Sequence, residues 1–157
     1  MNFWKELPKP FLTVAPVADV TDAAFRRMIA KYSPCDEGAP YVMWTEFVAA
    51  DGLLLATPEG KEKLMADLIF SEGEHPIVAQ LFTSNPEHME RAARLCAELG
   101  FDGVDINMGC PDRSIEKQGC GSAMIKTPEV AREVIKAAKR GAGDIPVSVK
   151  TRIGYNE

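Results

Sequence analysis

Several features that define other protein classes are missing from this sequence of 157 residues. No uninterrupted apolar run approaches the ~18 residues that a membrane helix needs, so we expect no membrane contact. The first residues lack the basic and then apolar run of a signal peptide, which predicts a cytoplasmic protein. The cysteines form no C-x-x-C pair, which argues against a zinc site or a disulfide framework, so we expect no metal. The four cysteines are Cys35, Cys96, Cys110 and Cys120.

The charge balance is that of an acidic protein. With 18 basic and 23 acidic residues, the formal net charge is −5. This total argues weakly against a nucleic-acid partner, because phosphate contacts need Lys and Arg, but it leaves room for a local basic patch. The hydrophobic share of 46% and the chain length fit one globular domain.

Five short runs rich in Val, Ile, Leu, Phe and Tyr predict strands. They are short and nearly continuous, which is typical of buried parallel strands. Each gap between them has room for one helix, so the chain follows a βα repeat. The runs are Phe11–Ala15, Tyr41–Glu46, Ile77–Phe82, Gly103–Asn107 and Pro146–Thr151.

Capping residues and helix breakers mark where the helices begin and end. Residues 66–71 either continue the fourth helix or form a short strand, and the sequence leaves both open. The predicted helices run from Thr21 to just before Pro34, from Asn85 to Gly100 and from Thr127 to Gly141, and a less regular fourth begins after Thr57.

The α/β alternation predicts a parallel sheet, either open or closed into a barrel. Residues 15–21 follow the first strand without the glycines of a dinucleotide-binding turn, and Gly119 and Gly121 follow no predicted strand. These two observations favour the (β/α)8 TIM barrel. Because a whole barrel needs about 250 residues, we expect residues 1–157 to form only its first five βα units, the N-terminal part of a catalytic domain.

Barrel enzymes carry their chemistry at the C-terminal ends of the strands. Side-chain alternation puts Asp105 and Asn107 on one face of the fourth predicted strand. It puts Ser148, Lys150 and Arg152 on one face of the fifth, while apolar neighbours take the opposite faces. We therefore predict a site inside the top of the barrel.

Cys110 is the first candidate for chemistry. A cysteine is usually a small core hydrophobe, and that role suits Cys96 on its helical stripe. Cys110 instead lies in residues 107–111, where a strand gives way to a loop containing Gly and Pro. We therefore favour a functional role for Cys110 and structural or incidental roles for Cys35 and Cys120.

Three polar residues lie at other strand ends, and for two of them the sequence leaves two interpretations open. Lys150 would face the barrel interior, which is costly unless it is paired. It is either a structural partner of Asp105 or a ligand for an anion or a flavin. The amide of Gln80 suits the edge of a pyrimidine or flavin ring, but alone it is weak evidence. Glu46 is a base or a hydrogen-bond anchor.

The strand-end motifs resemble those of the tRNA-dihydrouridine synthases, which are flavoenzymes built on a (β/α)8 barrel. The likeness covers nearly all of the chain, and the NMGCP block is its most specific part. The motifs are residues 15–22 (APVADVTD), 25–26 (FR), 45–46 (TE), 79–82 (AQLF), 100–111 (GFDGVDINMGCP), 117–123 (KQGCGSA) and 149–154 (VKTRIG).

The resemblance implies FMN as cofactor and NAD(P)H as reductant. By position, Pro16, Val17 and Ala18 would lie along the FMN, and Gln80 and Lys150 would contact its isoalloxazine ring. The family's phosphate-binding loops and C-terminal helical domain have no counterpart in these residues. The resemblance therefore implies a chain with part of the flavin site, and we expect the chain by itself to be inactive.

The resemblance also implies roles at the substrate. Cys110 would be the proton donor, while Asn107 and Arg152 would contact the substrate. Two residues depart from the family pattern in the first loop, where Val17 replaces the usual Met and Asp19 the usual Gly. Cys120 also replaces a smaller residue between two glycines.

The implied activity is the NAD(P)H-driven reduction of uridine to 5,6-dihydrouridine in tRNA. One alternative is an FMN-dependent barrel oxidoreductase that acts on a free pyrimidine, such as a dihydroorotate dehydrogenase. The other is a fragment without catalytic activity. A local basic rim for tRNA would consist of Arg113, Lys117, Lys126, Lys150 and Arg152.

Overall fold

The computed structural model describes residues 2–33 and 41–156. Its strands are β1 (Leu12–Val14), β2 (Tyr41–Ala49), β3 (Ile77–Phe82), β4 (Gly103–Met108) and β5 (Val147–Thr151). Its α-helices are α1 (Ala23–Tyr32), α2 (Ala50–Leu55), α3 (Pro58–Ala66), α4 (Pro86–Glu98), α5 (Arg113–Glu116) and α6 (Pro128–Ala142). Three short 3-10 helices are η1 (Phe3–Lys5), η2 (Glu72–Glu74) and η3 (Gly121–Lys126).

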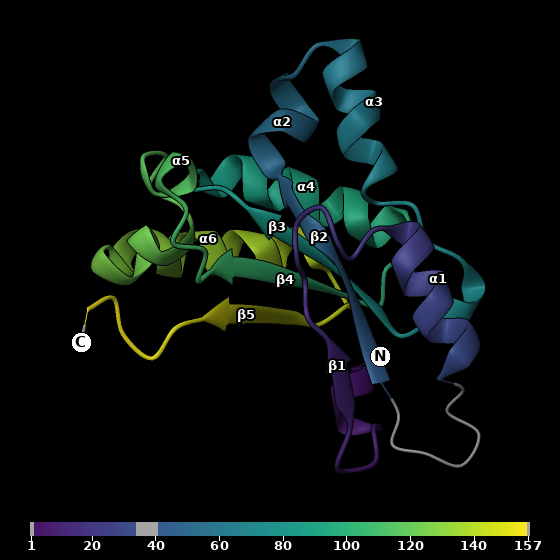
Figure 1. The fold of residues 1–157 in the computed structure, drawn as a ribbon. Coiled ribbons are helices and arrows are strands. Elements are labelled where there is room, and N and C mark those ends of the chain that lie inside the picture. Colours follow the sequence, from purple (N-terminus) through teal and green to yellow (C-terminus); the bar gives the residue numbers. More distant parts are fainter. Residues whose placement is uncertain (1, 34–40, 157) are drawn as a thin grey trace.

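The five strands form one sheet in the order β1-β2-β3-β4-β5, and every neighbouring pair is parallel. This sheet is half of a barrel. The predicted α/β class and the partial (β/α)8 barrel are therefore confirmed. Figure 1 shows α4 and α6 together on one face of the sheet, with α2 and α3 projecting away from it.

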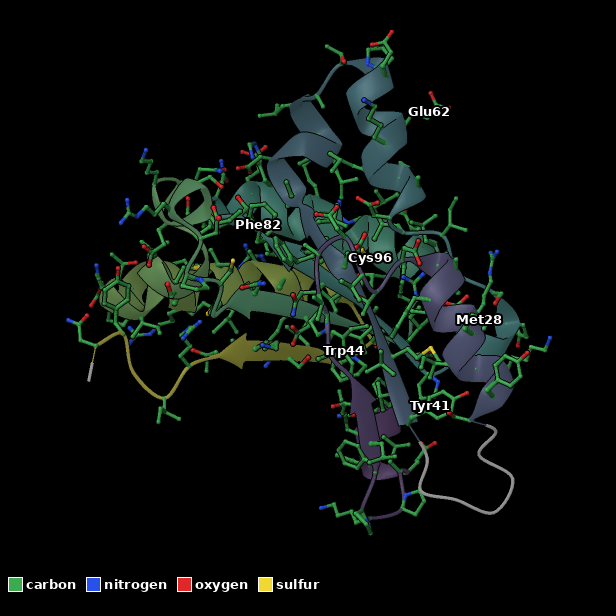
Figure 2. All side chains as sticks on the ribbon, viewed as in Figure 1. Met28, Tyr41, Trp44, Glu62, Phe82 and Cys96 are labelled. Atoms are coloured by element: carbon green, nitrogen blue, oxygen red, sulfur yellow. The ribbon has the colours of Figure 1, made fainter. Side chains whose placement is uncertain are left out.

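The main core lies between the sheet and helices α4 and α6. Val104 and Ile106 are completely buried there, as the predicted alternation required. Cys96 packs into the same core from α4 (Figure 2). Gly141 allows α6 to approach α4 closely, because a Cβ at this position would overlap the backbone carbonyl of Glu90.

A smaller cluster lies on the other face of the sheet, toward the N-terminal ends of the strands. Trp44 of β2 packs there against Trp4 of η1, with ring centroids 5.8 Å apart. Val42 and Val78 complete the buried part of this cluster. These side chains cover the lower part of the inner face and leave the strand tops to polar residues.

Several strand and connection predictions need correction, and the segment that the sequence left open is now defined. The first strand covers only Leu12–Val14, and the second continues to Ala49 past an irregular register between Trp44 and Phe47. Helix α2 follows β2 directly and was not predicted. Residues 67–71 neither continue α3 nor form a strand.

Two helix ends also differ from the sequence prediction. Asp22, not Thr21, caps α1, because its carboxylate accepts the N–H of Phe25. Helix α6 runs one residue past Gly141 and ends before Gly143, whose φ is 61°. The caps at Thr57 and Asn85 are confirmed. Pro34 and Cys35 lie outside the described residues.

In the described part of the chain, no helix is both long and apolar enough to cross a membrane.

Candidate functional site

A chain of polar side chains crosses the inner face of the sheet near the strand tops. The carboxylate of Asp105 on β4 accepts from Gln80 Nε2 at 2.6 Å and from Ser148 Oγ at 2.6 Å. Gln80 Oε1 on β3 accepts from Asn107 Nδ2 at 3.0 Å. Three neighbouring strands are therefore joined by side chains that all point into the half-barrel, as the alternation predicted for Asp105, Asn107 and Ser148.

Asn107 continues this chain into the loop that carries Cys110. Its Oδ1 accepts from the backbone N–H of Gly109 at 3.2 Å and of Cys110 at 3.0 Å. Arg152 Nε donates to the Gly109 carbonyl at 2.6 Å. The Cys110 side chain is half-buried and packs against the small cluster of Phe82, Ile115 and Cys120. The loop is held from both sides, so the thiol occupies a defined place at the end of β4.

The carbonyl of Cys110 is bound by η3. It accepts from the N–H of Ser122 at 2.9 Å. Gly121 has a φ of 60°, and a Cβ there would lie 2.5 Å from the Cys110 carbonyl oxygen. Glycine is required at position 121 for both reasons. The glycine-rich segment after α5 therefore closes on the Cys110 loop.

A cavity of about 260 Å³ lies on the inner face between β1 and β5. Its lining includes Ala15 and Pro16 after β1, with Lys150 of β5 opposite. Asp105 and Ser148 line the same cavity, which connects it to the hydrogen-bonded chain. Among the described residues Lys150 has no ion-pair partner, although its charge acts on Asp105.

The loop between β1 and α1 is folded on Thr21. The buried Thr21 hydroxyl accepts the N–H of Val17 at 3.0 Å and donates to the Val17 carbonyl at 3.1 Å. Because the Val17 N–H is already bound, only its 46% exposed side chain is available to a ligand. Ala18 is exposed on the same loop. Asp19 adopts a left-handed φ of 58°. This is the position where the family that the sequence resembles usually has glycine.

Glu46 acts as a hydrogen-bond anchor for this loop. Its Oε1 accepts from the backbone N–H of Val20 at 3.1 Å. Burial and the nearby carboxylate of Asp67 raise the pKa of Glu46, and burial and the charge of Asp19 raise the pKa of Asp67. Three carboxylates therefore crowd one end of the loop.

Arg26 holds the same loop from below, and sequence reasoning did not assign it this role. Its guanidinium donates to the Thr21 carbonyl at 2.7 Å, to the Ile69 carbonyl at 2.6 Å and to Glu74 Oε2 at 2.7 Å. Glu74 Oε1 accepts from the backbone and hydroxyl of Ser71. The only signal in the sequence was the Phe-Arg motif at residues 25–26, since nothing local pairs residues 26 and 74.

Burial dominates the electrostatics of the inner face. It raises the pKa of Asp105, while the hydrogen bonds from Ser148 and Gln80 and the charge of Lys150 act in the opposite direction. Burial also raises the pKa of Cys96 to about 12, which makes that thiol unreactive at neutral pH. Cys120 is completely buried and its pKa is also raised by burial.

A basic groove adjoins the Cys110 loop on α5 and η3. Arg113, Lys117 and Lys126 line it together with Tyr155 and Glu116, around a volume of about 300 Å³. Lys126 Nζ lies 3.5 Å from the centroid of the Tyr155 ring. In the described ranges, 2–33 and 41–156, none of the three cations forms an ion pair. This groove is one part of the predicted basic rim.

The predicted site residues therefore fall into two connected groups. Gln80, Asn107 and Cys110 share one hydrogen-bonded chain, and Pro16 and Lys150 face one cavity, with Asp105 belonging to both groups. Val17 and Ala18 lie on the loop next to this cavity, and Arg152 binds the Cys110 loop. No cluster of three or more His, Cys, Asp or Glu side chains suited to a metal occurs in the part that the structure describes.

Comparison with known proteins places this site in a family. Residues 13–157 match the family described as "Dihydrouridine synthase (Dus)". The chain is 46% identical over 156 residues to "Probable tRNA-dihydrouridine synthase 2" of Bacillus subtilis (strain 168), covering 99% of the chain and 45% of that protein. It is 44% identical over 156 residues to "Probable tRNA-dihydrouridine synthase" of Staphylococcus aureus (strain Mu50 / ATCC 700699), with the same coverage. The chain thus spans less than half the length of these relatives, and it belongs to the dihydrouridine synthase family.

Proposed function

We propose that this chain is the N-terminal part of the FMN-binding catalytic barrel of an enzyme that reduces uridine to 5,6-dihydrouridine in tRNA with NAD(P)H. The observation that carries the proposal is the Cys110 loop, a thiol fixed at the end of β4 by three backbone hydrogen bonds to Asn107 and Ser122. The names of the relatives and their identity of 44% to 46% point to the same activity.

The residues around the inner cavity fit a flavin ring. Pro16 and Ala15 offer an apolar wall, and Lys150 offers a positive charge without an ion-pair partner in the described part. Gln80 is completely buried by its bonds to Asp105 and Asn107 and does not line this cavity, so a contact between its amide and the ring would need these bonds to open. Bound FMN would supply the hydride carrier between NAD(P)H and uracil. Val17 and Ala18 would contact it through their exposed side chains.

The protein's own chemical contribution is a proton. Saturation of the uracil double bond adds a hydride at carbon 6 and a proton at carbon 5. The thiol of Cys110 gives its proton to carbon 5 as negative charge develops on the ring, and the thiolate regains a proton from solvent. Asn107 and Arg152, which bracket the Gly109–Cys110 loop, would hold the base in place.

An RNA substrate accounts for the basic groove in a chain of net charge −5. Arg113, Lys117 and Lys126 are available to phosphates, since none is engaged by a carboxylate within ion-pair distance in the described residues. Tyr155 carries Lys126 Nζ over one face of its ring, a cation–π contact that holds this positive charge in the groove. A free pyrimidine base has no phosphate groups for these cations to bind.

The test compares substrates in the full-length enzyme that contains this chain. The enzyme is incubated with FMN and NADPH and with either unmodified tRNA transcript, free uracil or orotate. Nucleosides and bases are then separated and weighed by mass spectrometry. We expect a gain of two hydrogens only on uridine within tRNA. Turnover of a free pyrimidine with no change in tRNA would overturn the proposal.

A further inference from the structure

We propose that Asp105 is a positioning residue that sets the direction of the hydrogen-bond chain holding the Cys110 loop. The inference rests on the proposed function only in giving Cys110 its role as acid. The chain runs from Asp105 through Gln80 and Asn107 to the backbone of Cys110.

Both ends of this chain have a fixed hydrogen-bonding character. At one end, the backbone N–H groups of Gly109 and Cys110 can only donate, so Asn107 must present its Oδ1 to them. At the other end, an ionised carboxylate at Asp105 can only accept, so Gln80 must present its Nε2. Between them, Asn107 Nδ2 meets Gln80 Oε1, which is the one arrangement that satisfies every group.

The two amides could each be turned around, and only their neighbours prevent it. Turning Gln80 would put its oxygen against the Asp105 carboxylate at 2.6 Å and its NH2 against the NH2 of Asn107. Water does not relieve such a conflict, because Gln80, Asp105 and Asn107 are 0%, 2% and 7% exposed. A carboxylate at the far end therefore determines which atom of Asn107 faces the Cys110 loop.

Reversing the direction of these hydrogen bonds distinguishes a positioning role of Asp105 from a role in packing alone. Asn107→Asp places carboxylates on both sides of Gln80, whose amide can satisfy only one of them as a donor. We therefore expect the side chain at 107 to withdraw from the loop. Adding Asp105→Asn gives every group a hydrogen-bond partner again, with donor and acceptor exchanged in the two bonds that Gln80 forms. The new amide at 105 donates to Gln80 Oε1 and accepts from Ser148, Gln80 Nε2 donates to the new carboxylate at 107, and that carboxylate accepts from the Cys110 N–H.

The readout is amide hydrogen exchange of the peptide that contains Gly109 and Cys110, measured by mass spectrometry on the full-length enzyme. Asn107→Asp should speed this exchange roughly tenfold, the effect of losing about one net hydrogen bond. Asn107→Asp with Asp105→Asn should return it toward the wild-type rate. Asp105→Asn alone should have an intermediate effect, because the Ser148 hydroxyl can accept as well as donate.

Ser148→Ala is the matched control. It removes one donor to Asp105 but leaves a carboxylate there, so exchange at Gly109 and Cys110 should stay near the wild-type rate. A double variant that exchanges as fast as Asn107→Asp, or that fails to fold, would overturn the inference. The outcome is separate from the proposed function, because rescue of exchange in an enzyme that does not need Cys110 for turnover would leave the positioning role intact.

Discussion

The guanidinium of Arg26 lies 2.7 Å from the carboxylate of Glu74, and both side chains are completely buried. Two further bonds from Arg26 reach the carbonyls of Thr21 and Ile69. This ion pair therefore joins the end of the loop that carries Pro16 to the segment before β3. It is a connection that water does not reach, in contrast to the exposed bond between Val20 and Glu46.

Arg26→Ala should lower the free energy of unfolding by about 3–5 kcal/mol, because it leaves the Glu74 carboxylate buried without its partner. Urea denaturation of the full-length enzyme measures the change. Arg27→Ala is the control, since Arg27 is 54% exposed and its Nε lies 3.7 Å from the same Glu74. It should cost less than about 1 kcal/mol. Equal losses for the two variants would show that Arg26 is not the anchor of this loop.

Asp67→Asn should stabilise the protein at neutral pH. The pKa of Asp67 is raised above its ordinary value of 3.8 by burial and by the charge of Asp19. A raised pKa means that the folded state loses stability as pH rises through that pKa. The substitution removes this loss, so we expect a gain of about 0.5 kcal/mol at pH 7, disappearing as the pH falls toward 3.8.

Urea denaturation at neutral and acidic pH tests the Asp67 prediction. Glu62→Gln is the control, because Glu62 is exposed on α3 (Figure 2). Its substitution should change stability little at either pH. A loss of stability in Asp67→Asn at neutral pH would mean that the crowding of Glu46, Asp19 and Asp67 is not the dominant effect.

Lys150→Met should weaken FMN binding or slow reduction of the flavin by NADPH. The substitution removes the positive charge from the cavity that Pro16 and Asp105 also line. Loss of one charge-assisted contact corresponds to roughly a tenfold effect or more. Flavin fluorescence titration and stopped-flow absorbance give the two values. Lys139→Met, at an exposed position on α6, should change neither. An unchanged flavin affinity and reduction rate in Lys150→Met would remove Lys150 from the site.

The 157-residue chain by itself should not turn over and should hold FMN weakly. It contributes five strands, and barrels bind phosphate through loops after strands seven and eight. Losing two or three charge-assisted contacts, each worth about 1.5–3 kcal/mol, weakens binding by several orders of magnitude. Within the described residues β1 and β5 each pair on one side only, which favours self-association. Submicromolar FMN binding by a monodisperse monomer would contradict this expectation.

The sequence predicted the strands best where they are buried on both faces. Ile77–Phe82 is β3 to the residue, because every side chain in it is buried and the apolar run has clear ends. Helix α2 escaped prediction because it follows β2 without a Gly or Pro break, and Ala49 provides no side-chain cap. Thr21 was wrongly predicted to cap α1. Its hydroxyl instead binds the backbone of Val17 within the loop, and no capping pattern in the sequence reveals that contact.

The sequence predicted which face of the sheet the site's side chains lie on, but not which of them are hydrogen-bonded to one another. Alternation placed Asp105, Asn107 and Ser148 on the inner face without the structure. It could not show that Gln80 joins Asp105 to Asn107, because that contact spans two strands 25 residues apart in the chain. The buried pair of Arg26 and Glu74 was missed for the same reason.

The role of Cys110 as proton donor is tested most directly by turnover of Cys110→Ala in the full-length enzyme. The variant should still bind FMN and accept electrons from NADPH, while its rate of dihydrouridine formation in tRNA falls by ~10²–10⁴, the usual contribution of one positioned acid. Cys96→Ala, which alters a thiol buried in the core, should keep nearly full turnover. Dihydrouridine formation by Cys110→Ala at the wild-type rate would contradict the role of Cys110 as proton donor.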